Sequence, residues 1–113
     1  MIRNKTKKTI VAASFELCKS PISKSIGLML SSKPKTLLFT WAKERKVPLH
    51  MLFVFFPIDV LFLDEEKAVV ELKEHFLPFT FYNPGHKAKY IIEAPDGAIA
   101  RSKTSVGDII TFI

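Results

Sequence analysis

The most apolar stretch of the chain runs from Val47 to Asp64, and its few polar residues do not alternate with the apolar ones. A strand with one face in water alternates apolar and polar positions, so a stretch without alternation predicts strands covered by protein on both faces. Pro57 divides the stretch, because proline has no N–H to donate to a sheet. The pattern therefore predicts two central strands, residues 47–55 and 58–63.

The same stretch could also be considered as a membrane span. From Leu49 to Leu63 it is shorter than the ~20 apolar residues that a helix needs to cross a bilayer. It also contains a proline, a histidine and a carboxylate, so no membrane span is predicted.

Shorter apolar runs between turn signals predict the other elements. The further strands are expected at residues 9–15, 37–41, 68–76, 89–93 and 109–113. Residues 42–46 are expected to form a polar loop that joins 37–41 and 47–55 into a hairpin. Ser20 and Pro21 followed by apolar residues at helical spacing predict a helix over 21–30, and 98–103 could form one or two helical turns.

These elements predict a mainly β domain (or an α+β domain with few helices). We expect a compact β-sandwich or barrel-like domain of about seven or eight short strands with one or two short helices. The length of 113 residues is that of one domain, so residues 1–113 are expected to share one core.

The net charge of +6 comes mainly from the N-terminus, because four of the 17 basic residues lie within residues 1–8. A nucleic-acid binder should carry its basic residues as a stripe on the folded surface, so a nucleic-acid partner is not favoured. We expect residues 1–8 to form an edge strand or to be partly flexible, since lysines at an edge prevent pairing between sheets of different molecules.

Few residues have the spacing of a metal or cofactor site. Cys18 is the single cysteine and cannot form an internal disulfide, which fits a reducing cytoplasm. The three histidines, His50, His75 and His86, follow no metal-ligand spacing, and no phosphate-binding loop or dinucleotide fingerprint is present. The sequence predicts no metal, no cofactor, no signal peptide and a cytoplasmic location.

Several segments in a fixed order resemble a known family. They are Gly27-Leu28-Met29, Leu37-Leu38-Phe39, Pro57-Ile58-Asp59 with the apolar run to Asp64, Lys89-Tyr90-Ile91-Ile92-Glu93, and Val106-Gly107-Asp108. In this order and spacing they resemble the domain-of-unknown-function 192 (DUF192) family of prokaryotes. The resemblance implies a β-sandwich-like or barrel-like fold and no known activity. Before the Pro-x-Asp motif the family usually carries Trp-Met and an Asn-Thr pair, and the matching positions here are His50, Met51, Phe53 and Val54.

Asp59 is the first candidate for chemistry, because an unpaired carboxylate inside an apolar strand is costly. Its oxygens could simply accept backbone N–H groups at the Pro57 turn, or they could bind a ligand or act in catalysis. His50 is the second candidate. If the strands on either side of Pro57 form a hairpin, His50 and Asp59 could come together as a histidine oriented by a carboxylate, which is the beginning of a general base. No nucleophile accompanies them.

Three further residues are candidates for ligand binding. Tyr90 and Glu93 match the Tyr-x-x-Glu segment of the DUF192 family, and Phe81 belongs to an aromatic patch with Phe79 and Tyr82. Exposed aromatic residues can line an apolar pocket or a partner surface. The leading hypothesis is a non-enzymatic module with an apolar cleft that binds a small ligand or a protein. The alternatives are a small enzyme that uses His50 and Asp59, and a nucleic-acid accessory domain that uses the basic N-terminus.

Overall fold

The computed structural model describes residues 1–19, 33–51 and 54–113. These residues form strands with one short helix, and the helix predicted over 21–30 lies outside them. The elements are β1 (Ile2–Asn4), β2 (Thr9–Ala12), β3 (Glu16–Cys18), β4 (Leu37–Arg45), β5 (Leu49–His50), β6 (Ile58–Leu63), β7 (Val69–Phe76), β8 (Phe81–Tyr82), β9 (Ala88–Pro95), α2 (Ala98–Ser102) and β10 (Ile110–Phe112).

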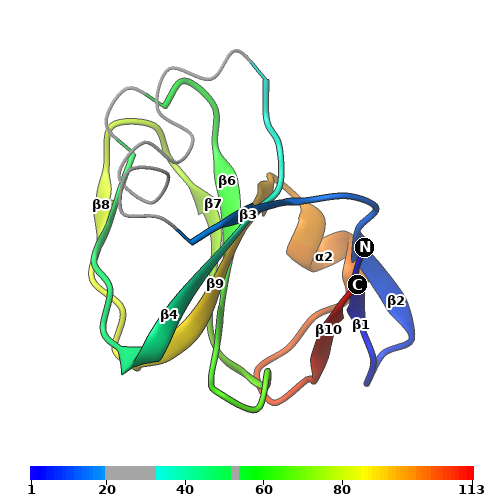
Figure 1. Cartoon of the computed structure of the whole chain (residues 1–113). Coiled ribbons are helices and arrows are strands. Elements are labelled where there is room, and N and C mark those ends of the chain that lie inside the picture. The colour runs from blue at the N-terminus through cyan, green and yellow to red at the C-terminus, as the bar shows by residue number, and fades with distance from the viewer. Residues whose placement is uncertain (20–32, 52–53) are drawn as a thin grey trace.

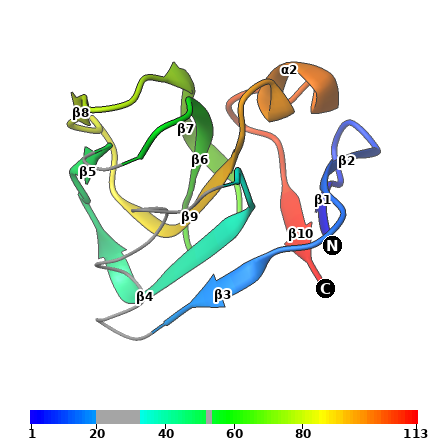
Figure 2. The same ribbon diagram turned by 90° about the horizontal axis from the view of Figure 1, so that it is seen from above.

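The strands form three sheets, and the mainly β fold predicted from the sequence is confirmed. The central sheet has the order β3-β4-β9-β6-β7, and only the β3–β4 pair is parallel. A three-stranded sheet, β10-β1-β2, lies on one side with α2, and the small β5-β8 sheet lies on the other (Figures 1 and 2). The central sheet is therefore covered on both faces.

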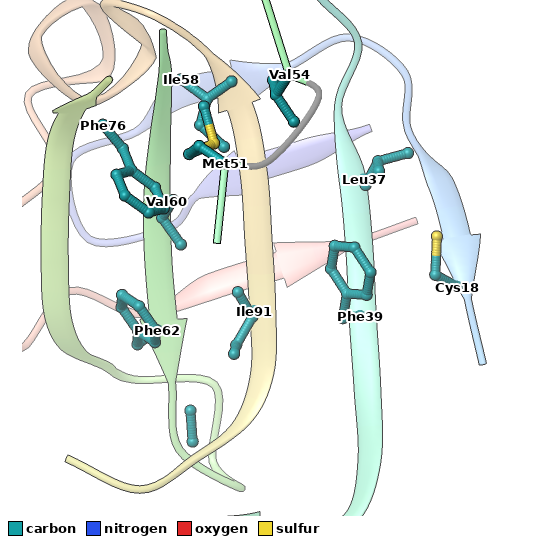
Figure 3. Close-up of a cluster of buried hydrophobic side chains, with 11 residues drawn as sticks. Cys18, Leu37, Phe39, Met51, Val54, Ile58, Val60, Phe62, Phe76 and Ile91 are labelled. Carbon is teal, nitrogen blue, oxygen red and sulfur yellow. The ribbon is translucent and has the colours of Figure 1, made fainter. Parts of the chain in front are cut away.

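Strand β6 shows why the middle of the chain lacks alternation. All six of its residues are buried, and its five apolar residues are divided between two apolar clusters, one on each face of the sheet. Figure 3 shows the first core, which consists of Cys18, Leu37, Phe39, Met51, Val54, Ile58, Val60, Phe62, Phe76, Ala88 and Ile91. The second core, on the opposite face, consists of Ile2, Val11, Leu38, Leu61, Leu63, Val69, Ile92, Ala94, Ala98, Ile99 and Ile110. The prediction that strand 58–63 meets protein on both faces is confirmed.

The predicted strand 47–55 and its hairpin with 37–41 are wrong. Strand β4 continues through the expected polar loop to Arg45, because its backbone pairs with β9 as far as Ala88 despite the charged side chains. Strand β5 is only two residues long and pairs with β8. Beyond it, Val54 N–H donates to the carbonyl oxygen of Met51, and the side chains of both residues belong to the first core. The apolar side chains of Met51 and Val54 are therefore explained by their burial in the first core and not by pairing in a long strand.

The N-terminal strand also differs from the prediction. Strand β1 lies between β10 and β2 instead of at an edge, with Ile2 and Asn4 buried. The N-terminal ammonium of Met1 donates to the carbonyl oxygen of Ile113 at 2.7 Å, so the two termini lie side by side (Figure 1). The lysines at positions 5, 7 and 8 occupy the turn that follows β1. Pairing on both sides is possible because the ladder needs only the backbone of residues 2–4.

Within the ranges that the structure describes, no helix has the length and apolar character needed to cross a bilayer.

Candidate functional site

Asp59 is buried, with an exposed fraction of 1%, and both of its carboxylate oxygens accept backbone hydrogen bonds. The N–H of His75 donates to Oδ1 at 3.0 Å, and the N–H of Ile99 donates to Oδ2 at 2.9 Å. Ile99 lies in the first turn of α2, whose N-cap residue, Gly97, makes no side-chain cap. Asp59 therefore supplies from the sheet the acceptor that the helix start lacks.

The second donor to Asp59 comes from an irregularity in β7. The pairing register of β6 with β7 shifts at Asp59. Ile58 pairs with Phe76 and Val60 pairs with Lys73, so two residues of β7 stand opposite the single residue Asp59. His75 has a φ of 49° there, and its N–H turns to the carboxylate. Backbone donors at the Pro57 turn were one of the roles that the sequence left open for Asp59. The actual donors are 16 and 40 residues away along the chain.

His50 does not share a strand pair with Asp59. His50 is exposed on β5 and stands opposite Phe81 of β8, whereas β6 pairs with β7 and β9. The hairpin on which a His50–Asp59 pair depended is therefore not formed in the described residues. The carboxylate that would orient the histidine is already engaged by the backbone.

Phe81 belongs to an exposed aromatic surface, which we define as Phe55, Phe79 and Phe81. Phe81 has an exposed fraction of 69%, and the rings of Phe55 and Phe79 meet edge to face with centroids 5.6 Å apart. Such a surface is larger than the single exposed apolar residues common on proteins. It supplies apolar contact area near the β5-β8 sheet.

Tyr90 packs at the opposite side of the molecule from this surface, among residues of the second core. Its ring meets that of Phe112 with centroids 5.3 Å apart, and the ammonium groups of Lys67 and Lys89 lie within 6 Å of its ring. These contacts tie β9 to β10. They give Tyr90 a packing role that needs no ligand.

Glu93 is the candidate whose surroundings differ most from those of Asp59. It lies in the middle of the central sheet, opposite Leu37 of β4 and Val60 of β6, which both belong to the first core. Its exposed fraction is 9%, and burial raises the pKa of its carboxyl to about 7. Within residues 1–19, 33–51 and 54–113, no hydrogen bond or ion pair to Glu93 is formed. No fully enclosed side-chain oxygen among these residues lacks a partner, so the Glu93 carboxyl group is largely but not completely enclosed.

Cys18 is the polar neighbour of Glu93 on the first-core side. Burial raises the pKa of the Cys18 thiol, and the carboxylates of Glu16 and Glu93 raise it further, while Lys35 lowers it. The thiol is therefore kept in its neutral form, which is a poor nucleophile. Cys18 is therefore a packing neighbour of Glu93 and not a reactive group.

Sequence reasoning missed another carboxylate that is anchored by hydrogen bonds, Glu71 of β7. Its Oε1 accepts the N–H groups of Gly85 and His86 and lies 2.8 Å from His86 Nδ1, and its Oε2 accepts the hydroxyl of Tyr82. Partial burial acts to raise the pKa of Glu71, but these hydrogen bonds outweigh burial and lower it. The Asn83-Pro84-Gly85 turn and the strand 68–76 were both predicted from the sequence, but the contact between them was not.

A pocket of about 650 Å³ also lies within the described residues, and none of the five sequence candidates lines it. It is bordered by the segment that joins β2 to β3, by residues 34–36 before β4, and by Pro95 and Arg101. Sequence patterns could not find it, because its walls come from four separate parts of the chain.

Comparison with known proteins identifies the family. The profile of the DUF192 family, described as "Uncharacterized ACR", matches residues 2–112. The chain belongs to the DUF192 family. A UPF0127 protein of Thermococcus sibiricus is 36% identical over 99% of this chain and 74% of its own length, and one of Pyrococcus abyssi is 33% identical over 100% and 97%.

Solved structures support the fold. A putative transcription regulator from Sinorhizobium meliloti has a TM-score of 0.80 with 24% identity, and covers 86% of this chain and 79% of its own. A protein of unknown function from Novosphingobium aromaticivorans also has a TM-score of 0.80, with 18% identity over 87% and 74%. At these identities the similarity shows a shared fold alone.

The DUF192 resemblance suggested changed positions before the Pro-x-Asp motif. His50 is exposed on β5, Met51 and Val54 are buried in the first core, and Phe53 lies outside the described residues. The apolar replacement at Val54 therefore extends the apolar surroundings on the side of the sheet that Glu93 faces.

Proposed function

We propose that this DUF192 protein is a non-enzymatic module that binds a small, largely apolar ligand, with Glu93 as the polar contact. The observation that carries the proposal is a carboxyl group buried between Leu37 and Val60 with no hydrogen-bond partner in the described residues. Ligand sites are mostly apolar with a few placed polar groups that fix orientation. Glu93 beside the first core has this composition.

Burial of the Glu93 carboxyl group destabilises the folded protein when the group is ionised. An ionised carboxylate without partners is unfavourable in an apolar environment, and the raised pKa of about 7 expresses that cost. Asp59 avoids the same cost by accepting two backbone hydrogen bonds. A protein that keeps an acid at a destabilising position gains something else from it, and strongly perturbed carboxyl groups gather at functional sites.

A small ligand fits this position better than a protein partner does. Only 9% of Glu93 is exposed, so a flat protein surface has little of it to touch. A small molecule with an apolar body could reach the carboxyl through one polar group. Below pH 7 the carboxyl is neutral and can donate a hydrogen bond; above it, the carboxylate accepts one or pairs with an amine.

The two alternatives receive less support. A general base built from His50 and Asp59 would need an Asp59 oxygen for the imidazole, and both oxygens already accept backbone N–H groups. A nucleic-acid role would need the N-terminal lysines for phosphates. Lys7 instead forms an ion pair with Asp108 at 2.8 Å and donates to the carbonyl oxygen of Lys103.

Native mass spectrometry of freshly purified protein tests the proposal. We expect the wild-type protein to retain a co-purifying small molecule, and Glu93→Gln to lose it or to retain it without the wild-type change across pH 7. Glu74→Gln is the matched control, because Glu74 is an exposed glutamate on β7. Equal retention by Glu93→Gln at every pH, or a wild-type protein that never carries a ligand, would contradict the proposal.

A further inference from the structure

The pocket between the two larger sheets carries an inference independent of Glu93. Its apolar walls come from residues on four elements or segments: Val11 of β2, Phe15, Pro34, and Pro95 of β9. At about 650 Å³ its volume lies within the range of small-molecule sites. The chain between β2 and β3 crosses here from one sheet to the other (Figures 1 and 2).

Three charged residues line this pocket, and their charges do not cancel. Glu16 and Lys35 pair with each other, with Oε2 and Nζ 3.2 Å apart. Arg101 of α2 is the third, and in the described part of the chain it forms no ion pair. The pocket therefore has a surplus of one positive charge, carried by the guanidinium of Arg101.

The guanidinium of Arg101 is held in place by the turn before α2. Its Nη1 donates to the carbonyl oxygen of Asp96 at 3.3 Å. A Cβ at Gly97 would lie 2.8 Å from the same Nη1, and Gly97 has a φ of 92°, so only glycine leaves room for the side chain in this position. The hydrogen bond places the exposed guanidinium among the residues that line the pocket, where its remaining N–H groups can pair with an anion.

We propose that this pocket is a second binding site, for a small molecule with an apolar body and one anionic group that pairs with Arg101. The apolar body lies against Val11, Phe15 and Pro95, and the anion receives charge-assisted hydrogen bonds from the guanidinium. This site goes beyond the function proposed above, because neither Glu93 nor its neighbours Leu37 and Val60 line the pocket.

Two probes of equal length separate the apolar contribution from the charge. Octanoate carries a carboxylate, whereas 1-octanol carries none. In amide chemical-shift titrations, we expect both to shift Ser14 and Thr36, and octanoate to bind about tenfold more tightly, the effect of one charge-assisted contact. Equal affinities, no binding of octanoate, or shifts confined to other residues would overturn the proposal.

Three variants sharpen this test. Arg101→Gln should reduce the affinity for octanoate about tenfold and leave that for octanol unchanged. Arg45→Gln removes the same charge from an exposed residue at the opposite end of β4 and should change neither. Ala13→Phe adds a ring at an exposed lining position and should block both probes.

The same titrations keep the two sites apart. Glu93→Gln should leave the octanoate affinity unchanged, since Glu93 does not line this pocket. Full octanoate affinity in Arg101→Gln, or octanoate shifts that survive Ala13→Phe, would show that this pocket is not the anion site, whatever the outcome at Glu93.

Discussion

Asp59 and Glu93 occupy neighbouring rungs of the same pair of strands, but they face opposite sides of the central sheet. Asp59 stands opposite Ala94 and Glu93 opposite Val60, so the two carboxyl groups lie on the sides of the second and first core, respectively. Both are buried. Asp59 binds two backbone N–H groups, whereas Glu93 has no such partner in the described residues. Burial alone therefore does not distinguish a structural carboxylate from a candidate site; the hydrogen-bond partners of the two groups do.

The largest expected effect is the loss of the Asp59 carboxylate. Asp59→Ala leaves the buried N–H of Ile99 and the partly buried N–H of His75 without an acceptor, at about 1–3 kcal/mol each, so we expect the free energy of unfolding to fall by about 4 kcal/mol. Urea denaturation measures it. Asp96→Ala, at an exposed partner of His75, should cost less than about 1 kcal/mol. A loss below about 1 kcal/mol for Asp59→Ala would mean that the two backbone hydrogen bonds do not stabilise the fold, and the contrast between Asp59 and Glu93 would fail.

The second largest expected effect is an increase in the free energy of unfolding on substitution of Glu93, and this increase depends on pH. The pKa of Glu93 is about 7 in the folded protein, against an ordinary value of 4.5, so the folded state binds more protons between these two pH values. Stability should therefore fall as the pH rises through this window and level off above it. Glu93→Gln should be about 3 kcal/mol more stable than wild type above pH 7, and equal to it below pH 4.5.

Urea denaturation across this pH range checks the prediction for Glu93. The exposed Glu74→Gln should follow the wild-type profile throughout. If Glu93→Gln and wild type keep a constant difference at every pH, Glu93 is not the group that titrates, and the contrast with Asp59 fails.

Glu71 provides an intermediate case, because its side chain is partly buried and its partners are a hydroxyl and a turn. Tyr82→Phe removes one hydrogen bond to Glu71 and keeps the ring that packs on Phe62 and Phe76. We expect a loss of about 1 kcal/mol in the free energy of unfolding. A loss as large as that of Asp59→Ala would mean that side-chain donors matter as much as buried backbone donors do.

The smallest effect should come from His75, whose backbone and side chain have different roles. His75→Asn removes the exposed pair between Nδ1 and Asp96 but keeps the N–H that binds Asp59, and asparagine tolerates the positive φ. We expect a change within about 0.5 kcal/mol in thermal or urea unfolding. A larger loss would show that the imidazole, and not the backbone, supports this end of β6.

The limits of the sequence prediction follow from the range of the interactions. Strand β6 was predicted because an apolar run without alternation, bounded by a proline, is a local signal. Glu93 drew notice through the family resemblance alone, since an acid after an apolar run reads as an ordinary strand end. Its burial depends on β4 and β6, which pair with β9 from distant parts of the chain.

The sequence by itself determined the mainly β composition, the family, and the buried strand Ile58–Leu63, because hydrophobic pattern and motif order are properties of the chain. Only the tertiary structure decided which acids are satisfied and where Arg101 and Phe15 share a pocket. The physical reason is that a carboxylate is stabilised or left without partners by atoms that approach through folding, and these atoms lie tens of residues away in sequence.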